Sequence, residues 1–201
     1  MLRVGLTGGL ACGKSFVGRT LEQFGCTLIR ADDIGHDVLL AGGSAFQAAV
    51  NEFGSDILNA SGEIDRHKLA ALVFDNPGRL ARLNELVHPA VIQREEELLA
   101  AAAARDPKGI AVVEAAILIE TGSYKRFDKL IVVSCTPEQQ VARAVHRDGS
   151  TEEEARARLR RQMPVEEKLR YADFVVDTSG AKEQTVAQTR AVYEKLRSFV
   201  K

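Results

Sequence analysis

The stretch Gly8-Gly9-Leu10-Ala11-Cys12-Gly13-Lys14-Ser15 decides the fold of this chain. It follows the apolar run of residues 3–7 and precedes an amphipathic run, so it joins a predicted strand to a predicted helix. Glycines let the backbone wrap around a phosphate, and the N–H groups that open the helix attract the same anion. This context favours a nucleoside triphosphate loop over an ordinary glycine-rich turn. The predicted loop comprises Gly8, Gly9, Ala11, Cys12, Gly13, Lys14, Ser15 and Phe16.

Two side chains of this loop have predicted roles in phosphate chemistry. Lys14 is expected to reach the β- and γ-phosphates, and Ser15 to supply a hydroxyl ligand to Mg²⁺.

The composition places the chain among ordinary globular proteins. Its 201 residues, 45% hydrophobic and 27% charged, suffice for one main domain with an elaboration. No apolar run approaches the roughly 18 residues of a membrane span, and the start lacks the pattern of a signal peptide, so we expect a cytoplasmic protein without membrane contact. The net charge of -1 predicts no general attraction to nucleic acid, and three scattered cysteines argue against a disulfide framework or a zinc site.

Apolar strands alternate with amphipathic helical stretches along the chain. This pattern predicts a parallel five-stranded sheet with helices on both faces, and together with the phosphate loop it predicts an α/β P-loop NTPase fold. The predicted strands are residues 3–7, 27–30, 110–114, 129–134 and 174–177. Residues 34–108 are too long for a simple crossover and predict an inserted helical domain, punctuated by Pro77, Pro89 and Pro107. Residues 1–33 and 109–201 would form the core that carries the phosphate loop.

An arginine-rich stretch lies between the fourth and fifth predicted strands. Small P-loop kinases carry a mobile lid at this position, and arginines in a lid neutralise charge on the transferred phosphoryl group. We therefore interpret residues 143–164 as a helical lid, with Arg143 and Arg147 as its candidate catalytic residues. For any single arginine, a surface salt bridge remains the competing interpretation.

The acceptor side of a kinase needs an acid near the reacting hydroxyl. Asp32 and Asp33 follow the second predicted strand, where ligands bind in open α/β sheets, although either could instead cap a helix that begins near Ile34. Glu114 ends the third strand and could hold a magnesium-bound water or cap a loop. His88 stands at the predicted end of the helical stretch 80–87, where a lone histidine is more often a helix-end residue than a ligand.

In this order, these segments resemble the dephospho-coenzyme A kinase family over nearly the whole chain. The resemblance rests on the loop from Leu6 to Ser15 and on later segments that are more selective than the loop. These are Ala31-Asp32, Leu86-Val87-His88-Pro89, Leu118-Ile119-Glu120, Arg147-Asp148-Gly149, Gln162-Met163-Pro164 with Lys168, and Ala172-Asp173-Phe174-Val175-Val176-Asp177.

The resemblance implies transfer of the ATP γ-phosphoryl group to the ribose 3′-hydroxyl of dephospho-coenzyme A (dephospho-CoA), with Mg²⁺ bound at Ser15. It implies that Asp32 orients that hydroxyl and takes its proton, and that Lys14, Arg143 and Arg147 stabilise the transferred group. Arg66 and His88 would lie in the helical domain that receives the acceptor. We expect a monomer or weak homo-oligomer whose partner is this small molecule.

Five positions depart from the family pattern, which commonly has an acid at Arg30, a serine or threonine at Cys12 and Phe16, a proline at Ala116 and an asparagine at Thr178. Beside Lys14, the Cys12 thiol is expected to have a lowered pKa and to oxidise when the site is empty. Two other functions remain open: a kinase for another hydroxyl acceptor, and a coenzyme-binding sensor without turnover. A GTP switch is disfavoured because the chain has no Asn-Lys-x-Asp segment.

Overall fold

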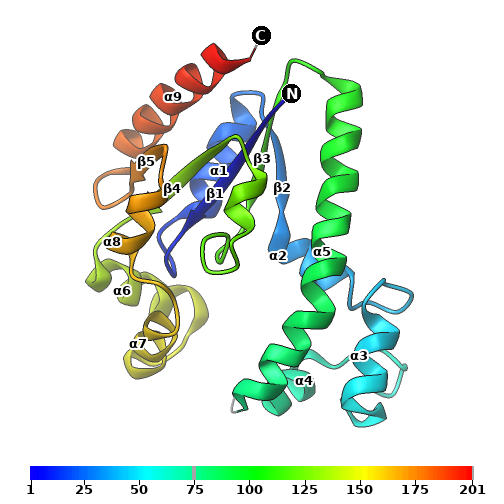
Figure 1. Cartoon of the computed structure of the whole chain (residues 1–201). Helices are drawn as coiled ribbons and strands as arrows, with labels where there is room; N and C mark the ends of the chain where they lie inside the picture. Colours follow the sequence, from blue (N-terminus) through cyan, green and yellow to red (C-terminus); the bar gives the residue numbers. More distant parts are fainter. Residues whose placement is uncertain (74–75, 201) are drawn as a thin grey trace. The chain divides into compact units, whose positions relative to one another are not determined.

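The computed structural model describes residues 1–73 and 76–200 (Figure 1). They form two compact units. The sheet unit consists of Met1–Ile29 with Leu99–Lys201, and the helical unit consists of Arg30–Leu98. One boundary falls at the end of the predicted strand 27–30 and the other lies inside a long helix, whereas the sequence predicts an insertion at residues 34–108.

All five predicted strands are present and belong to one sheet. They are β1 (Leu2–Gly8), β2 (Thr27–Arg30), β3 (Ile110–Glu114), β4 (Lys129–Ser134) and β5 (Phe174–Asp177). The spatial order is β2-β3-β1-β4-β5, and β1 pairs in parallel with both β3 and β4. Strands β2 and β3 lie on one side of β1, and β4 and β5 lie on the other. The carboxyl end of β1 is therefore a topological switch point. The predicted phosphate loop starts at this point.

Side chains alternate between the two faces of β1, and each face has its own cover. Val4 and Leu6 are fully buried in one core with residues of α1 (Lys14–Gln23) and α9 (Lys182–Phe199). Gly5 and Thr7 face the other way. A Cβ at Gly5 would press on Leu118, Leu130 and Phe127. Small side chains on this second face therefore let the segment after β3 pack closely on the sheet.

The predicted lid, residues 143–164, spans the second half of one helix and the whole of the next. These helices are α6 (Pro137–Asp148) and α7 (Glu152–Arg160), followed by the short helix α8 (Val165–Lys168). Each of the first two begins with a threonine capping box, Thr136 with Gln139 and Thr151 with Glu154. Gly149 ends α6 in the left-handed conformation, which permits the turn into α7.

The helical unit has a small core of its own. Its helices are α2 (Ala31–Asp37), α3 (Phe46–Phe53), α4 (Arg66–Val73) and α5 (Pro77–Arg105), the last of which ends in the sheet unit. Ile57, Leu69 and Val73 are buried together at its centre.

The expected helix end at His88-Pro89 is wrong. Helix α5 runs through Pro89 without ending. A proline inside a helix removes one backbone donor and costs about 3 kcal/mol, but 29 residues of continuous helix outweigh that local cost. Pro77 begins this helix and Pro107 follows its end, so these two prolines do mark boundaries.

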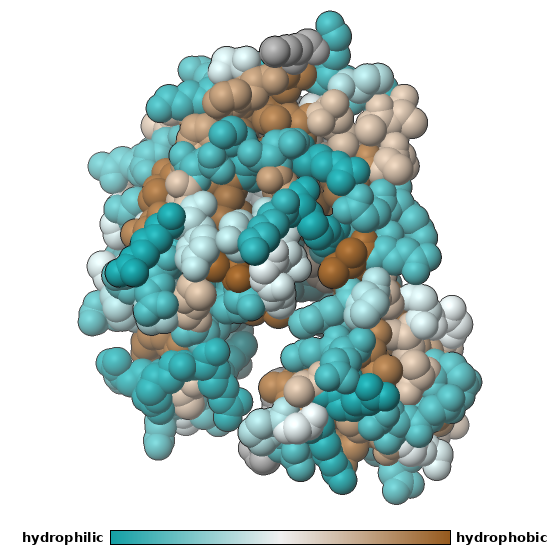
Figure 2. All heavy atoms as spheres, viewed as in Figure 1, coloured by the Kyte–Doolittle hydropathy of each residue, from teal (hydrophilic) through white to brown (hydrophobic). Residues whose placement is uncertain are grey.

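Figure 2 shows that hydrophilic side chains cover most of the visible face, with apolar ones scattered between them. Within residues 1–73 and 76–200, no helix is both long and apolar enough to span a bilayer.

Candidate active site

The phosphate loop connects β1 directly to α1, and its shape depends on residues without large side chains. Gly13 precedes the helix with φ 85°, and its carbonyl accepts the N–H groups of Phe16 and Val17. A Cβ at Gly9 would collide with the amide of Gln140. Ala11 has φ 51°, a left-handed conformation that costs a non-glycine residue about 1 kcal/mol or more. Such strain is typical of a loop built to hold a ligand.

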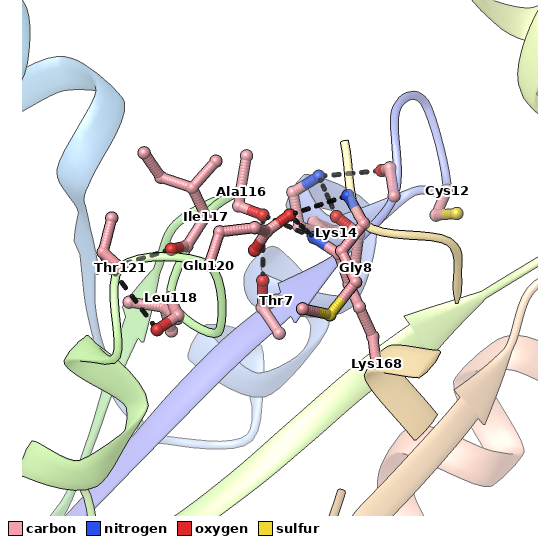
Figure 3. A network of polar contacts seen from close by, with 12 residues as sticks. Thr7, Gly8, Cys12, Lys14, Ala116, Ile117, Leu118, Glu120, Thr121 and Lys168 are labelled. Carbon is pink, nitrogen blue, oxygen red and sulfur yellow. Dashed lines mark hydrogen bonds and ion pairs between the residues drawn. The ribbon is translucent and has the colours of Figure 1, made fainter. Parts of the chain in front are cut away.

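The Lys14 ammonium lies at this loop. Its Nζ donates hydrogen bonds to the carbonyl oxygens of Gly8, at 3.1 Å, and Gly9, at 3.0 Å (Figure 3). The positive end of α1 and the ammonium therefore bring positive charge to the same loop, which is what a bound triphosphate requires.

Ser15 and Glu114 form the candidate metal position. The Ser15 hydroxyl donates to Oε1 of Glu114 over 2.6 Å, and Glu114 is 6% exposed at the end of β3. A hydroxyl and a carboxylate are oxygen ligands of the kind that Mg²⁺ prefers, so these residues fit this ion. Among the residues that the structure describes, no group of three histidine, cysteine or acidic side chains could hold a metal by itself. Phosphate oxygens would complete the coordination.

The Cys12 side chain of the loop is buried in a contact that the sequence did not reveal. Its buried Sγ accepts hydrogen bonds from the Cys135 thiol, at 3.5 Å, and from the Gln140 amide, at 2.7 Å. The Cys135 hydrogen bond is the main cause that lowers the pKa of Cys12 to about 6, with further contributions from Gln140 and from the charge of Lys14. The lowered pKa agrees with the sequence-based expectation, but its principal cause is a residue 123 positions away.

Arg143 is tied to the phosphate loop through Thr178. Its guanidinium donates to the Thr178 hydroxyl at 2.9 Å and to the Thr178 carbonyl at 2.6 Å. That hydroxyl donates in turn to the carbonyl of Cys12 at 2.8 Å. A candidate lid arginine is therefore linked by two successive hydrogen bonds to the loop that Lys14 belongs to.

Arg147 has a different environment on the same helix. It binds the carboxylate of Asp148 through two hydrogen bonds, and Arg158 of α7 binds the same carboxylate at 2.6 Å. Arg147, followed by Arg158, lowers the pKa of Asp148 to about 2. The Arg147 side chain is 58% exposed. This charge cluster joins the end of α6 to α7.

The lid helices are also packed on the loop itself. Leu10 shares a small core with Val141 and Ala144 of α6 and with Ala155 of α7. The predicted phosphate loop and the predicted lid are thus in direct apolar contact within the sheet unit.

The three predicted acceptor residues belong to the helical unit. Asp32 is exposed in the first turn of α2, which begins at Ala31 after Arg30, so the interpretation of Asp32 or Asp33 as the cap of a helix beginning near Ile34 is wrong. Arg66 opens α4 and lines a cavity of about 250 Å³. His88 is half-buried in α5, and this burial lowers the pKa of its imidazole.

The chain is similar to known proteins along almost its whole length. The family model described as dephospho-CoA kinase matches residues 2–184. A dephospho-CoA kinase of Aquifex aeolicus is 40% identical, over 98% of this chain and 98% of its own. The chain belongs to the dephospho-CoA kinase family. Kinases of this family phosphorylate dephospho-CoA with ATP in the last step of coenzyme A biosynthesis.

Solved structures agree with this family assignment. Dephospho-CoA kinase from Campylobacter jejuni has a TM-score of 0.65 at 25% identity and covers 96% of each chain. A protein from Thermus thermophilus has a TM-score of 0.81 at 30% identity and covers 97% of each chain. The fold of this member of the dephospho-CoA kinase family is therefore the α/β fold of the P-loop kinases.

Sequence reasoning missed several polar residues near the loop of this dephospho-CoA kinase family member. The sequence gives no sign that Gln140 and Thr178 contact Cys12, yet both bind it. Lys168 belongs to a family motif, but the sequence predicts no role for it, and it is completely buried. A lysine is almost never fully buried unless it is paired, and nothing local in the sequence signals that burial.

Proposed function

We propose that this chain transfers the γ-phosphoryl group of ATP to the ribose 3′-hydroxyl of dephospho-CoA, which yields CoA and ADP. The observation that carries this proposal is the phosphate loop with Lys14 and the Ser15–Glu114 pair, at the carboxyl ends of β1 and β3, in a chain of this family.

On the donor side, the loop N–H groups and Lys14 hold the β- and γ-phosphates. Ser15 and Glu114 would hold Mg²⁺, which when bound neutralises charge on the phosphate oxygens. Because phosphoryl transfer passes through a loose transition state, alignment and charge stabilisation are the main tasks of the protein. The loop provides both with groups that are already ordered.

On the acceptor side, we assign Asp32 as the base. The 3′-hydroxyl oxygen forms the new bond to phosphorus, its proton passes to the Asp32 carboxylate, and the bond to the ADP oxygen breaks. The exposure of Asp32 supports this role because a carboxylate must be accessible to the substrate. Asp32 is one helical turn before His36, so both side chains share a face of α2.

We assign Arg66 and His88 to acceptor binding. Arg66 and His36 line the same cavity, together with Leu39, and a guanidinium suits the diphosphate group of the acceptor. The lowered pKa of His88 keeps its imidazole neutral near pH 7, so it would donate and accept hydrogen bonds rather than supply a positive charge.

We assign Arg143 and Arg147 to the transferred phosphoryl group when the lid closes. Both bind other partners in this structure, Thr178 and Asp148, so each would exchange these contacts for phosphate oxygens. The proposed setting is the cytoplasm, with the chain acting as a monomer or weak homo-oligomer.

ADP release with ATP, Mg²⁺ and dephospho-CoA tests the proposal, with adenosine, AMP and shikimate as competing acceptors. The key variant is Asp32→Asn. The matched control is Asp33→Asn, which removes an equivalent charge from the same helical turn. The ion pair of Asp33 with Arg30 is long, at 3.9 Å, and the Asp33 side chain is 67% exposed, so this variant should lose little stability.

We expect turnover only with dephospho-CoA, a large loss in Asp32→Asn and near-normal rates in Asp33→Asn. Equal activity of the two variants would remove Asp32 from the mechanism. Phosphorylation of a different acceptor would replace the proposed substrate, and ATP binding without any turnover would favour the sensor.

A further inference from the structure

Lys168 is a completely buried cation with well-defined partners. It ends α8 with 0% exposure, and its Nζ is 2.7 Å from Oε1 of Glu120 and 2.9 Å from the carbonyl oxygen of Ala116 (Figure 3). An ammonium loses its hydration on burial, which is costly unless charged and polar partners replace the water. These two oxygens supply that replacement.

Each partner of Lys168 also binds a second segment. The Ala116 carbonyl accepts the Thr7 hydroxyl at 3.2 Å, and Oε1 of Glu120 accepts the Met163 N–H at 3.3 Å. The ammonium therefore lies between three segments that are far apart in the sequence. They are the end of β1, the segment after β3 and the segment that leaves the lid helix α7.

These three segments are attached to functional groups of the sheet unit. Thr7 directly precedes the phosphate loop, and it is completely buried on the face of β1 opposite Leu6. Ala116 is two residues beyond Glu114, which binds Ser15. Met163 lies three residues after the end of α7, the second lid helix. A displacement of Lys168 would reach the phosphate loop, the candidate metal position and the lid together.

We propose that Lys168 is a positioning residue for phosphoryl transfer. Through Glu120 and Ala116, it holds the segment after α7 and the segment after β3 in fixed positions relative to the phosphate loop. It acts through these residues and does not touch the substrate. The inference rests on the proposed function because its main readout is turnover.

The competing interpretation is that this buried pair only stabilises the fold. Removal of one partner of a buried pair leaves an uncompensated charge and is strongly destabilising, whereas replacement of both by neutral groups is often tolerated. Stability and positioning can therefore be separated with a double variant. Lys168→Met/Glu120→Gln removes both charges and retains similar side-chain volumes, but the introduced methionine cannot donate a hydrogen bond to the Ala116 carbonyl.

The experiment compares Lys168→Met, the double variant and a matched control, Lys129→Met. Lys129 also pairs with a carboxylate, that of Asp173 at 2.9 Å. It is the first residue of β4 and therefore lies at the end of this strand away from the phosphate loop. For each chain we would measure kcat, the KM values for ATP and dephospho-CoA, and the thermal midpoint. In both Lys168 variants we expect kcat to fall by about 100-fold, the size of effect caused by small misplacements of reacting groups, with an unchanged KM for ATP. The double variant should regain thermal stability without regaining kcat, and Lys129→Met should retain kcat.

Recovery of kcat together with stability in the double variant would overturn the inference. Absence of turnover in the unaltered chain would overturn the proposed function instead. In that case the amide exchange of residues 143–163 with and without ATP still decides the role of Lys168. Protection on ATP binding that is lost in the double variant supports positioning, and the same protection in both chains refutes it.

Discussion

The lowered pKa of Cys12 leads to a measurable difference between the three thiols of this chain. With a pKa of about 6, Cys12 is roughly 90% thiolate at pH 7, whereas a thiol with the ordinary value of 9.0 is roughly 1% thiolate. Burial raises the pKa of Cys26 to about 12, so this residue stays protonated and serves as an internal control. The Cys135 thiol donates to Cys12, which raises its own pKa.

Ultraviolet absorbance of the thiolate measures this titration without requiring a reagent to enter the core. We expect one thiolate to appear with a midpoint near pH 6, and Cys12→Ser to abolish it. Cys135→Ala removes the principal hydrogen-bond donor, so it should move the midpoint towards 9.0. Because Cys12 is fully buried, a reagent reaches it only when the loop opens, so ATP bound at the loop should slow alkylation of Cys12 at pH 7.

The stability of the chain should follow the same titration. Between about pH 6 and the unfolded value of 9.0, the folded chain binds fewer protons at Cys12 than the unfolded chain does. The contribution of this group to the free energy of unfolding therefore rises with pH across this window, and it is lost as the pH falls through 6. A thiolate midpoint that stays near 9 in the unaltered chain, or that does not change in Cys135→Ala, would refute the reasoning.

Two further predictions concern the metal position and helix α5. Glu114→Gln keeps the shape of the Ser15 partner but removes its charge, and it should lower Mg²⁺ affinity or activity by about 10- to 100-fold, as judged from Mg²⁺ titrations of kcat. The exposed Glu194→Gln on α9 should change neither, and equal behaviour of the two variants would exclude Glu114 from the metal position. Pro89→Ala restores a backbone donor at an exposed position inside α5. The substitution gains about 3 kcal/mol in helix propensity and loses about 1 kcal/mol because the unfolded chain becomes more flexible. The free energy of unfolding, measured in urea, should therefore rise by about 2 kcal/mol. An unchanged or lower denaturation midpoint would contradict the stated cost of this proline.

The predicted strands and the phosphate loop were recoverable from local patterns. The strands combine short apolar runs with turn residues at their ends. The loop combines glycines with Lys14 and Ser15 at the spacing of a phosphate-binding loop. Helices α6 and α7 also carry local signals in the sequence, because Thr136 and Thr151 precede them with side chains that cap their backbone.

The helix break expected at Pro89 shows where a local rule fails. The rule describes the cost at one residue correctly, but the continuous helix around it contributes more than that cost. The assignments of Asp32, Arg66 and His88 to acceptor binding remain predictions, which single substitutions at these residues can test.

The sequence by itself determined the family and the order of the strands along the chain, and it predicted the residues that bind phosphate, because each of these depends on side chains that are close in sequence. Only the tertiary structure decided which distant groups meet. The contacts of Cys12 with Cys135, of Ser15 with Glu114 and of Lys168 with Ala116 join residues 123, 99 and 52 positions apart, respectively. The physical reason is that parallel strands bring their carboxyl ends to one edge of the sheet, whatever the length of chain between them. The pKa of a thiol or the burial of an ammonium is then set by partners that no local pattern identifies.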